Sequence, residues 1–383
     1  MVEEHKTSIS QNNLKSVITY LSENKTRRKS KTIDSALNGL LGEGFHGKTY
    51  RLGKHLRGNT LQKHIHDKDI IKIKLYTSDY TEEIFLTDNK DINDFIEFIL
   101  NHNETIAKEF KSTFWTTGST KRQDFEDEIS INRRVIKYYG TKATKFLTVT
   151  PITGFRNYKV IGCYINFKKK DTLYIAFGSE CDNKYKMNIN KLVIDILESL
   201  VILQEANYQH NDIKLDNIVR CNGRYKLIDW GQASSIEEFK FGDMICTSPI
   251  KWYINGMTAY ISKYLMDYRT AMVNSPYEKS SIFREKNAQI ISEFNITISN
   301  NPDIHVLHNK YKRNLDVFML GMTLLHAVFR YNLNYEKYRY LIDRMTSLIH
   351  PWSSAKEALH YTKNYFNKNT QSIRSLTRKN TKN

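Results

Sequence analysis

The sequence has few cysteines, no long apolar run and no acidic residue near its end. Its four cysteines, Cys163, Cys181, Cys221 and Cys246, are far apart and form neither a Cys-x-x-Cys pair nor a cluster with histidine. We therefore expect no zinc site, no disulfide framework and a reducing compartment. No apolar run approaches the ~18 residues that a membrane span requires. The polar start, MVEEHKTSIS, lacks the apolar core of a signal peptide. These absences predict a soluble intracellular protein, cytoplasmic or nuclear, without a membrane partner.

Basic residues outnumber acidic ones by 58 to 41, which gives a formal charge of +17. Much of the excess lies near the two ends, within residues 25–31 and in a tail that has no acidic residue after position 360. Runs of like charge usually repel each other and stay solvated. A nuclear-localisation or nucleic-acid patch is the alternative interpretation, and acidic proteins are further candidate partners. The sequence does not indicate an oligomeric state.

The order of the expected elements predicts an α+β chain of two lobes. A glycine-rich turn in LLGEGFHGKTYRLG separates two short apolar segments, and a β-branched strand follows at 69–76. Helical spacing occurs in DINDFIEFIL and at 124–140, and further strands are expected in YKVIGCYINF and TLYIAFG. A long apolar helix is expected at 189–208, then two short strands around Cys-Asn-Gly-Arg, then an apolar helix at 315–329.

The strongest chemical signal is HNDIKLDN (210–217), which is followed after 11 residues by Asp229-Trp230-Gly231. Phosphoryl transfer to a hydroxyl needs a carboxylate that accepts the proton and cations that hold the phosphate. Asp212 and Lys214 are two residues apart, so in an extended loop they face the same way. Asn217 supplies a neutral oxygen suited to Mg²⁺. The expected hairpin returns the chain, so that Asp229 can bind the same metal ions.

These residues resemble the eukaryotic-type protein kinase family, whose catalytic loop reads H-R-D-x-x-x-x-N and whose metal loop reads D-F-G. The resemblance implies a bilobal fold, with a small antiparallel-sheet N-lobe and a mainly helical C-lobe. It also implies transfer of the γ-phosphate of ATP to Ser or Thr hydroxyls of proteins, with Mg²⁺ as cofactor. Lys214 stands where serine/threonine kinases have a lysine. The resemblance gives His210, Asp316 and Thr247 supporting roles around the catalytic loop.

The same resemblance extends to the nucleotide site. The residues that it aligns with the glycine-rich loop over the ATP phosphates are Gly42, Glu43, Gly44, Phe45, His46 and Gly47. Thr49 and Ile70 would then lie over the base, and Lys72 would be the lysine that anchors the phosphates. Lys74 is the rival, but choosing it would place the charge of Lys72 against the adenine.

A glutamate on the next large helix should pair with Lys72. Glu128 is the expected partner, with Glu109 and Glu126 as alternatives, although the stretch between Lys72 and Glu128 is longer than the family usually has. The backbone of 174–178 would bind adenine. The expected organisation is a basic tail at 1–35, an N-lobe at 36–178 with an insertion at 77–122, a C-lobe at 179–366 with an insertion at 251–312, and a basic tail at 367–383.

Residues 42–49, GEGFHGKT, also match the Walker A pattern G-x-x-x-x-G-K-[ST] of P-loop NTPases. That motif needs a helix directly after Lys48 and Thr49, whereas Gly53 and Gly58 argue against a helix here. Three further functions remain as alternatives to a protein kinase. They are a catalytically impaired pseudokinase that acts as a binding module, a small-molecule phosphotransferase of kinase-like fold, and a basic nucleic-acid-binding protein.

Overall fold

A computed structural model of the chain describes most of the residues from 40 to 380. The described ranges are 40–43, 47–51, 70–79, 84–102, 105–110, 121–140, 143, 146–148, 151–168, 172–179, 181, 187–230, 233–237, 280–300 and 304–380.

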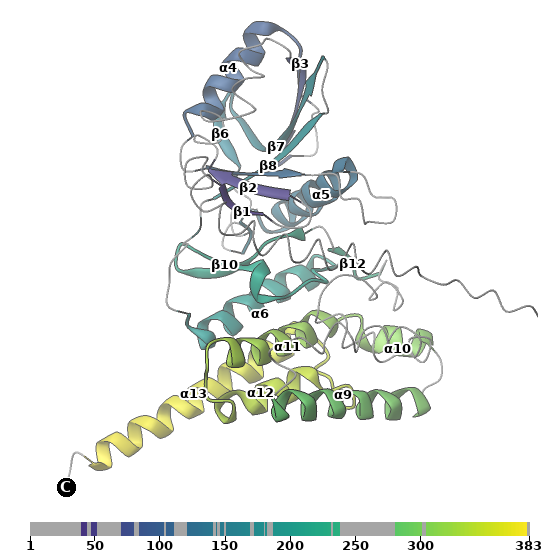
Figure 1. The fold of residues 1–383 in the computed structure, drawn as a ribbon, viewed down its shortest axis with the longest axis vertical. Helices are drawn as coiled ribbons and strands as arrows, with labels where there is room; N and C mark the ends of the chain where they lie inside the picture. Colours follow the sequence, from purple (N-terminus) through teal and green to yellow (C-terminus); the bar gives the residue numbers. More distant parts are fainter. Residues whose placement is uncertain are drawn as a thin grey trace, which may run out of the picture.

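An eight-stranded antiparallel sheet forms one half of the molecule (Figure 1). Its strands are β1 (Leu40–Glu43), β2 (Gly47–Arg51), β3 (Ile70–Thr77), β4 (Ile84–Leu86), β5 (Thr105–Phe110), β6 (Ile152–Phe155), β7 (Tyr158–Phe167) and β8 (Leu173–Ser179). The order across the sheet is β1-β2-β5-β8-β7-β3-β4, and β6 pairs with β7. Strand β5 therefore lies near the middle, whereas β3 is separated from β5 by two strands, β8 and β7.

Helix α4 (Asn89–Leu100) packs its apolar side against one face of the sheet. The side chain of Asp88 caps the helix by accepting a hydrogen bond from the amide of Lys90 at 2.6 Å. Phe95 and Ile99 of α4 join Ile73 of β3 in a common buried cluster. Because side chains alternate along a strand, this leaves the neighbouring β3 residues for the opposite face.

Helix α5 (Lys121–Tyr139) packs through Phe125 and Ile129 against the other cluster of the sheet, which includes Tyr76. Gly162 of β7 allows the close approach of this helix. A Cβ atom at Gly162 would lie 2.9 Å from Ile129 Cδ1 and 2.8 Å from the carbonyl oxygen of Ile175. The position of α5, and with it the position of Glu128, thus depends on a residue without a side chain.

Helices form the other half around one large apolar core (Figure 1). They are α6 (Ile189–Glu205), α9 (Ser281–Asn300), α10 (Ile304–Tyr311), α11 (Leu315–Arg330), α12 (Glu336–Thr346) and α13 (Ala355–Asn380). Between α6 and α9 lie four short strands and a 3-10 turn. These are β9 (Tyr208–Gln209), η2 (Leu215–Asn217), β10 (Ile218–Cys221), β11 (Arg224–Leu227) and β12 (Ser234–Ser235). Strand β10 pairs with β11, and β9 pairs with β12.

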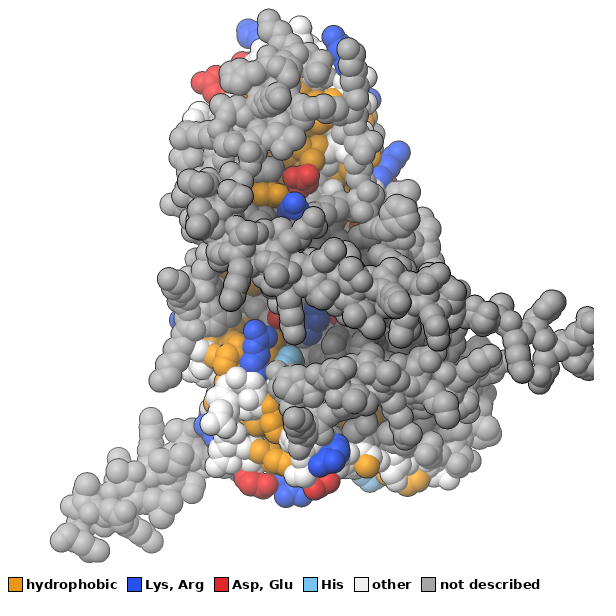
Figure 2. All heavy atoms as spheres, viewed as in Figure 1, with side chains coloured by type: hydrophobic (Ala, Val, Ile, Leu, Met, Phe, Trp, Pro, Cys, Tyr) orange, Lys and Arg blue, Asp and Glu red, His pale blue; other side chains and the backbone are white. Residues whose placement is uncertain are grey.

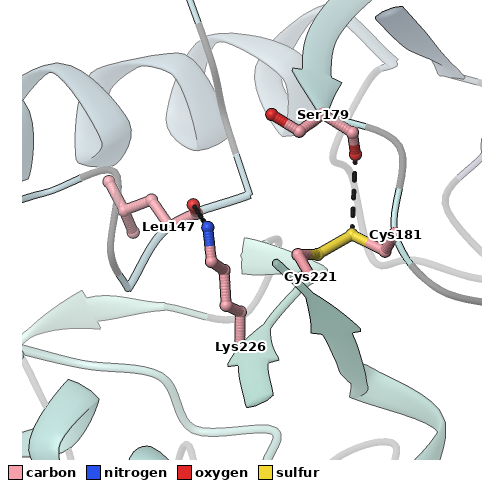
Figure 3. Close-up of a disulfide and its surroundings, with 5 residues drawn as sticks. All are labelled: Leu147, Ser179, Cys181, Cys221 and Lys226. Atoms are coloured by element: carbon pink, nitrogen blue, oxygen red, sulfur yellow. Dashed lines mark hydrogen bonds between the residues drawn. A yellow bond between two sulfur atoms is a disulfide. The ribbon is translucent and has the colours of Figure 1, made fainter. Parts of the chain in front are cut away.

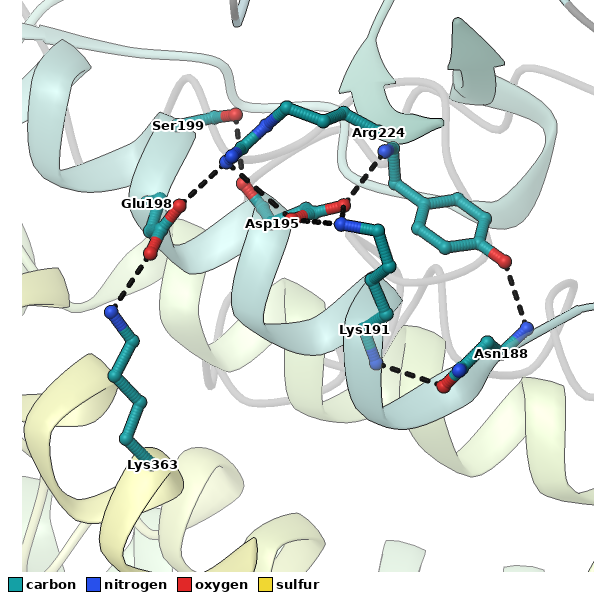
Figure 4. Close-up of polar contacts among 8 residues, drawn as sticks. Asn188, Lys191, Asp195, Glu198, Ser199, Arg224 and Lys363 are labelled. Carbon is teal, nitrogen blue, oxygen red and sulfur yellow. Dashed lines mark hydrogen bonds and ion pairs between the residues drawn. The ribbon is translucent and has the colours of Figure 1, made fainter. Parts of the chain in front are cut away.

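A buried carboxylate fixes the β10–β11 hairpin to α6 (Figure 4). Asp195 accepts a hydrogen bond from the amide of Tyr225 at 2.9 Å and forms an ion pair with Lys191 at 2.9 Å. One turn further along α6, Glu198 pairs with Arg224 of the hairpin and with Lys363 of α13. The hairpin that follows the catalytic loop is therefore tied to two helices.

The structure combines helices with an antiparallel sheet, which confirms the α+β class expected from the sequence. The long apolar helices are also confirmed, because α6 spans 189–205 and α11 spans 315–330. The stretch 77–122, expected as an insertion, contains β5, a central strand of the sheet. Strand β5 is thus part of the main sheet and not of an insertion, and β3, β4 and α4 precede it in the chain. Among the helices that the structure describes, none combines the length and the apolarity needed to cross a membrane.

The cysteines differ from expectation, because Cys181 and Cys221 form a disulfide (Figure 3). Cys181 follows β8 and Cys221 ends β10, so residues 40 positions apart become neighbours. Wide spacing in the sequence gave no sign of this pairing. Cys163 is a buried free thiol in β7, and burial raises its pKa.

Candidate functional site

The loop at 210–217 is fixed by Asp316, in the first turn of α11. Its two carboxylate oxygens accept hydrogen bonds from the amides of His210 at 2.7 Å and Asn211 at 2.9 Å. Thr323, further along α11, donates its hydroxyl to the carbonyl oxygen of Ile213 at 2.9 Å. Asp316 is only 2% exposed, so these charge-assisted bonds are shielded from water. A buried helix thus fixes the backbone on both sides of Asp212.

Asp212, Lys214 and Asn217 converge within this loop. Oδ2 of Asp212 accepts hydrogen bonds from Lys214 Nζ at 2.8 Å and from Asn217 Nδ2 at 2.9 Å. Asn217 Nδ2 also donates to the carbonyl oxygen of Asp212 at 2.9 Å. The second oxygen, Oδ1, is buried and has no hydrogen-bond partner among the described residues. Since an unpaired buried oxygen is costly, this atom is well suited to accept a proton from an incoming group.

The β10–β11 hairpin brings Asp229 beside Asn217. The amide of Ile228 donates to the carbonyl oxygen of Asn217 at 2.9 Å, directly before Asp229. Asp229 adopts a left-handed backbone conformation with φ of 65°, and Asn211 does the same with φ of 62°. Such conformations are uncommon outside glycine, and they concentrate at functional sites.

A lysine from the central sheet strand completes the cluster. Lys108 Nζ of β5 forms salt bridges with Glu128 of α5 at 2.6 Å and with Asp229 at 2.9 Å. Burial alone would lower the pKa of Lys108, but the charges of Glu128 and Asp229 outweigh it, so the net pKa is raised. Lys108 therefore stays protonated, and it links the sheet, helix α5 and the hairpin.

The expectation that Lys72 pairs with Glu128 is wrong. Lys72 lies on β3, with β8 and β7 between it and β5, and its Nζ is 3.8 Å from the centre of the Phe85 ring. Its rival, Lys74, lies on the same strand, with Nζ 5.0 Å from the centre of the Tyr76 ring. Ile70, also on β3, is buried in the apolar cluster beneath α4 and so is separated from the glycine turn.

Of the three glutamates considered, Glu128 is the one that forms a salt bridge with Lys108. Glu126 accepts a hydrogen bond from Arg122 at 3.0 Å and another from Tyr76 at 3.3 Å, and Glu109 lies on β5 itself. Sequence reasoning missed Lys108, although one signal was present. Lys108 precedes Glu128 by 20 residues, and choosing it removes the excess length that the Lys72 assignment required.

The glycine-rich segment is flanked by two paired strands. Strands β1 and β2 pair antiparallel, with Gly42 opposite Thr49 and Glu43 opposite Lys48. Because Lys48 and Thr49 lie inside a strand, the helix that a Walker A motif requires does not follow them, and the P-loop interpretation is wrong. Gly47 begins β2. The remaining expected residues of this turn, Gly44, Phe45 and His46, lie outside the described residues, as do Gly231 and Thr247.

The segment expected to bind adenine, 174–178, lies inside β8. Ile175 pairs with Glu109 on one side and Cys163 on the other, and Ala176 is likewise paired on both sides. At the end of β8, Ser179 pairs with Thr105, and its amide donates to the carbonyl oxygen of Thr148 at 3.0 Å.

His210 packs beneath the loop. Its ring lies 4.8 Å from the ring of Trp230, and its Nε2 is 3.2 Å from the carbonyl oxygen of Ile228. Burial lowers the pKa of His210, which favours the neutral ring near neutral pH. The ring therefore acts as a support between the catalytic loop and the residues next to Asp229.

The residues suited to hold Mg²⁺ are Asn217 and Asp229. The described residues contain no group of three or more His, Cys, Asp or Glu side chains arranged for a metal ion. Two oxygen-bearing side chains are nevertheless enough when phosphates and water provide the other ligands, which is the usual way proteins bind Mg²⁺.

No protein-family model and no curated protein matches the chain. Among solved structures, it is similar to monomeric WbdD at 11% identity and a TM-score of 0.22, over 50% of this chain and 42% of that one. The bifunctional kinase-methyltransferase WbdD matches at 13% identity and 0.22, over 48% and 41%. WbdD with the kinase inhibitor LY294002 matches at 11% and 0.23, over 55% and 44%. The chain spans less than half the length of these proteins, and similarity at this level assigns neither family nor site.

Proposed function

We propose that this chain is an ATP- and Mg²⁺-dependent protein kinase with the bilobal fold of the eukaryotic-type family. The observation that carries the proposal is the double salt bridge of Lys108 to Glu128 and Asp229. A buried cation that pairs with a helix carboxylate and also with the expected metal ligand is well placed to receive a phosphate. Through its salt bridge with Asp229, Lys108 is also connected to the hairpin that follows the loop of Asp212.

In the proposed reaction, a substrate hydroxyl attacks the γ-phosphorus of ATP, and the bond between that phosphorus and the bridging oxygen of ADP breaks. Oδ1 of Asp212 accepts the hydroxyl proton, while Lys214 offsets the charge on the transferring phosphoryl group. Lys108 orients the phosphates. Mg²⁺, held by Asn217 and Asp229, would neutralise charge on the phosphate oxygens.

We infer Ser and Thr side chains of proteins, acidic proteins among them, as the acceptors. This inference rests on Lys214, which matches the serine/threonine pattern. The complete set of lysine, base and metal residues disfavours a pseudokinase. Figure 2 shows the described Lys and Arg side chains of one face only, and the basic run at 25–31 lies outside the described residues, so nucleic-acid binding stays an alternative.

The test is incubation of the purified chain with Mg²⁺ and γ-labelled ATP, with casein, with histone and without added protein. We expect label in a protein band that resists acid treatment, as phosphoserine and phosphothreonine do. The label should be absent with Asp212→Asn, which keeps the shape of the side chain but cannot accept the proton as a carboxylate does. Label that persists in this variant would refute the assigned base. ATP consumption without protein labelling, abolished in the variant, would point to a small-molecule acceptor.

A further inference from the structure

The disulfide joins the exit of the central sheet to the hairpin that follows the catalytic loop (Figure 3). Cys181 lies two residues beyond Ser179, the last residue of β8. Cys221 ends β10, the strand that begins directly after Asn217. A covalent bond therefore connects β8, which pairs with the strand of Lys108, to the hairpin that precedes Asp229.

Noncovalent contacts also link these two halves. Lys108 pairs with Asp229, Arg134 of α5 donates to the hydroxyl of Tyr208, and Lys226 of β11 donates to the carbonyl oxygen of Leu147 at 3.1 Å. In addition, Ile131 and Val135 of α5 share one apolar cluster with residues of α6. The disulfide differs because it fixes the separation of the two backbones until it is chemically cleaved.

The fold does not depend on this bond for a core. Small domains use disulfides where too little apolar surface is buried, but this chain has extensive buried clusters in both halves. Cys163, the other described cysteine, remains a free thiol. One isolated disulfide in a large, well-packed chain is better explained by an effect on the site than by a need for a staple.

The two cysteines of the disulfide differ in their exposure to solvent. Cys221 is fully buried, with 0% exposure, whereas Cys181 is partly exposed. Sγ of Cys181 also lies 3.5 Å from the carbonyl oxygen of Ser179, from which position the reduced thiol can donate a weak hydrogen bond. A thiol reagent can therefore approach through Cys181, and the reduced side chain already has a partner.

We propose that the Cys181–Cys221 pair is a thiol–disulfide switch that controls nucleotide affinity at the proposed site. The inference rests on the proposed function. A dithiol reductant attacks Sγ of Cys181, and the Cys221 thiolate leaves. The second thiol of the reductant then releases Cys181, so that two cysteine thiols and one oxidised dithiol result. The oxidised form holds the β8 exit against the hairpin and is preorganised for the nucleotide, so it binds more tightly.

The experiment compares the wild-type chain before and after treatment with dithiothreitol. Differential alkylation and mass spectrometry measure the state of each cysteine, and a fluorescent ATP analogue with Mg²⁺ measures affinity. We expect the Kd to rise by roughly fivefold or more on reduction, the lower end of usual coupling between sites. Removal of the reductant and reoxidation should restore it.

Cys221→Ser should bind like the reduced wild type and should not respond to dithiothreitol. Cys163→Ala and Cys246→Ser, which remove the other two thiols, should keep the full response. Equal affinity in the two states, or alkylation of both Cys181 and Cys221 without reduction, would overturn the switch while leaving the proposed function standing. Absence of nucleotide binding in both states would overturn the proposed function, and the switch with it.

Discussion

Replacing Lys108 by Met tests whether Lys108, which pairs with Glu128 in the structure, or Lys72, the lysine expected from the sequence, is needed for phosphoryl transfer. Lys108→Met removes the cation from Glu128 and Asp229 but keeps most of the apolar stem. Lys72→Met is the matched control, since it makes the same change on β3. We expect the first variant to lose phosphoryl transfer and the second to keep it.

The structure also sets the expected cost in stability. Lys108 and Glu128 have side chains that are only 17% and 6% exposed, and their salt bridge is 2.6 Å long. Removing one partner of a buried pair strands the other charge, which costs about 3–5 kcal/mol. Lys72 loses only an interaction with the partly exposed ring of Phe85, worth about 0.5–1 kcal/mol.

Urea unfolding followed by fluorescence measures these costs, and labelled ATP measures activity. Adding Glu128→Leu to Lys108→Met should recover most of the lost stability, because the carboxylate that Lys108 left unpaired is then removed as well. Activity should stay absent in the double variant, which separates a chemical role from a structural one. The reasoning is refuted if Lys72→Met loses activity while Lys108→Met retains it, or if the two variants are equally stable.

Three further predictions concern the metal, the control of activity and the pH dependence. Asp229→Asn should abolish Mg²⁺-dependent turnover while some nucleotide binding survives, and near-normal turnover would remove Asp229 as the metal ligand. Phosphatase-treated protein should be fully active, because neutral Asn211 donates to the hydroxyl of Ser234 at 2.9 Å and offers no cation to a phosphate. A large loss of activity that ATP preincubation restores would count against this. Burial lowers the pKa of His210 below 6.5, so the unfolded chain binds more protons than the folded one. The stability that depends on neutral His210 should therefore be fully present above pH 6.5. It should decrease as the pH drops below 6.5, by up to about 1.4 kcal/mol per pH unit. Urea titrations of His210→Gln should show a shallower fall, and an unchanged slope would contradict the assignment.

The sequence predicted the parts of the site that lie close together along the chain. Asp212, Lys214 and Asn217 occupy one loop, and the hairpin after them is short, so spacing alone indicated that Asp229 would return to the same place. The apolar helices around them were equally predictable from their periodicity.

Contacts between distant strands were not predictable in this way. The strand at 70–77 carries Lys72 and Lys74, and the strand at 105–110 carries Lys108, but only the order of strands in the sheet decides which lysine faces Glu128. The pairing of Cys181 with Cys221 was hidden for the same reason. It follows from where β8 ends relative to β10, which is a property of the fold and leaves no mark in the local sequence.

The most direct test of the account is a crystal structure of the chain with Mg²⁺ and a non-hydrolysable ATP analogue. The account predicts that Lys108 Nζ contacts phosphate oxygens and that Asn217 and Asp229 coordinate Mg²⁺. It also predicts that the γ-phosphate points towards Oδ1 of Asp212. A nucleotide bound elsewhere, or phosphates held by Lys48 or Lys72 with Lys108 still paired only to its carboxylates, would contradict it.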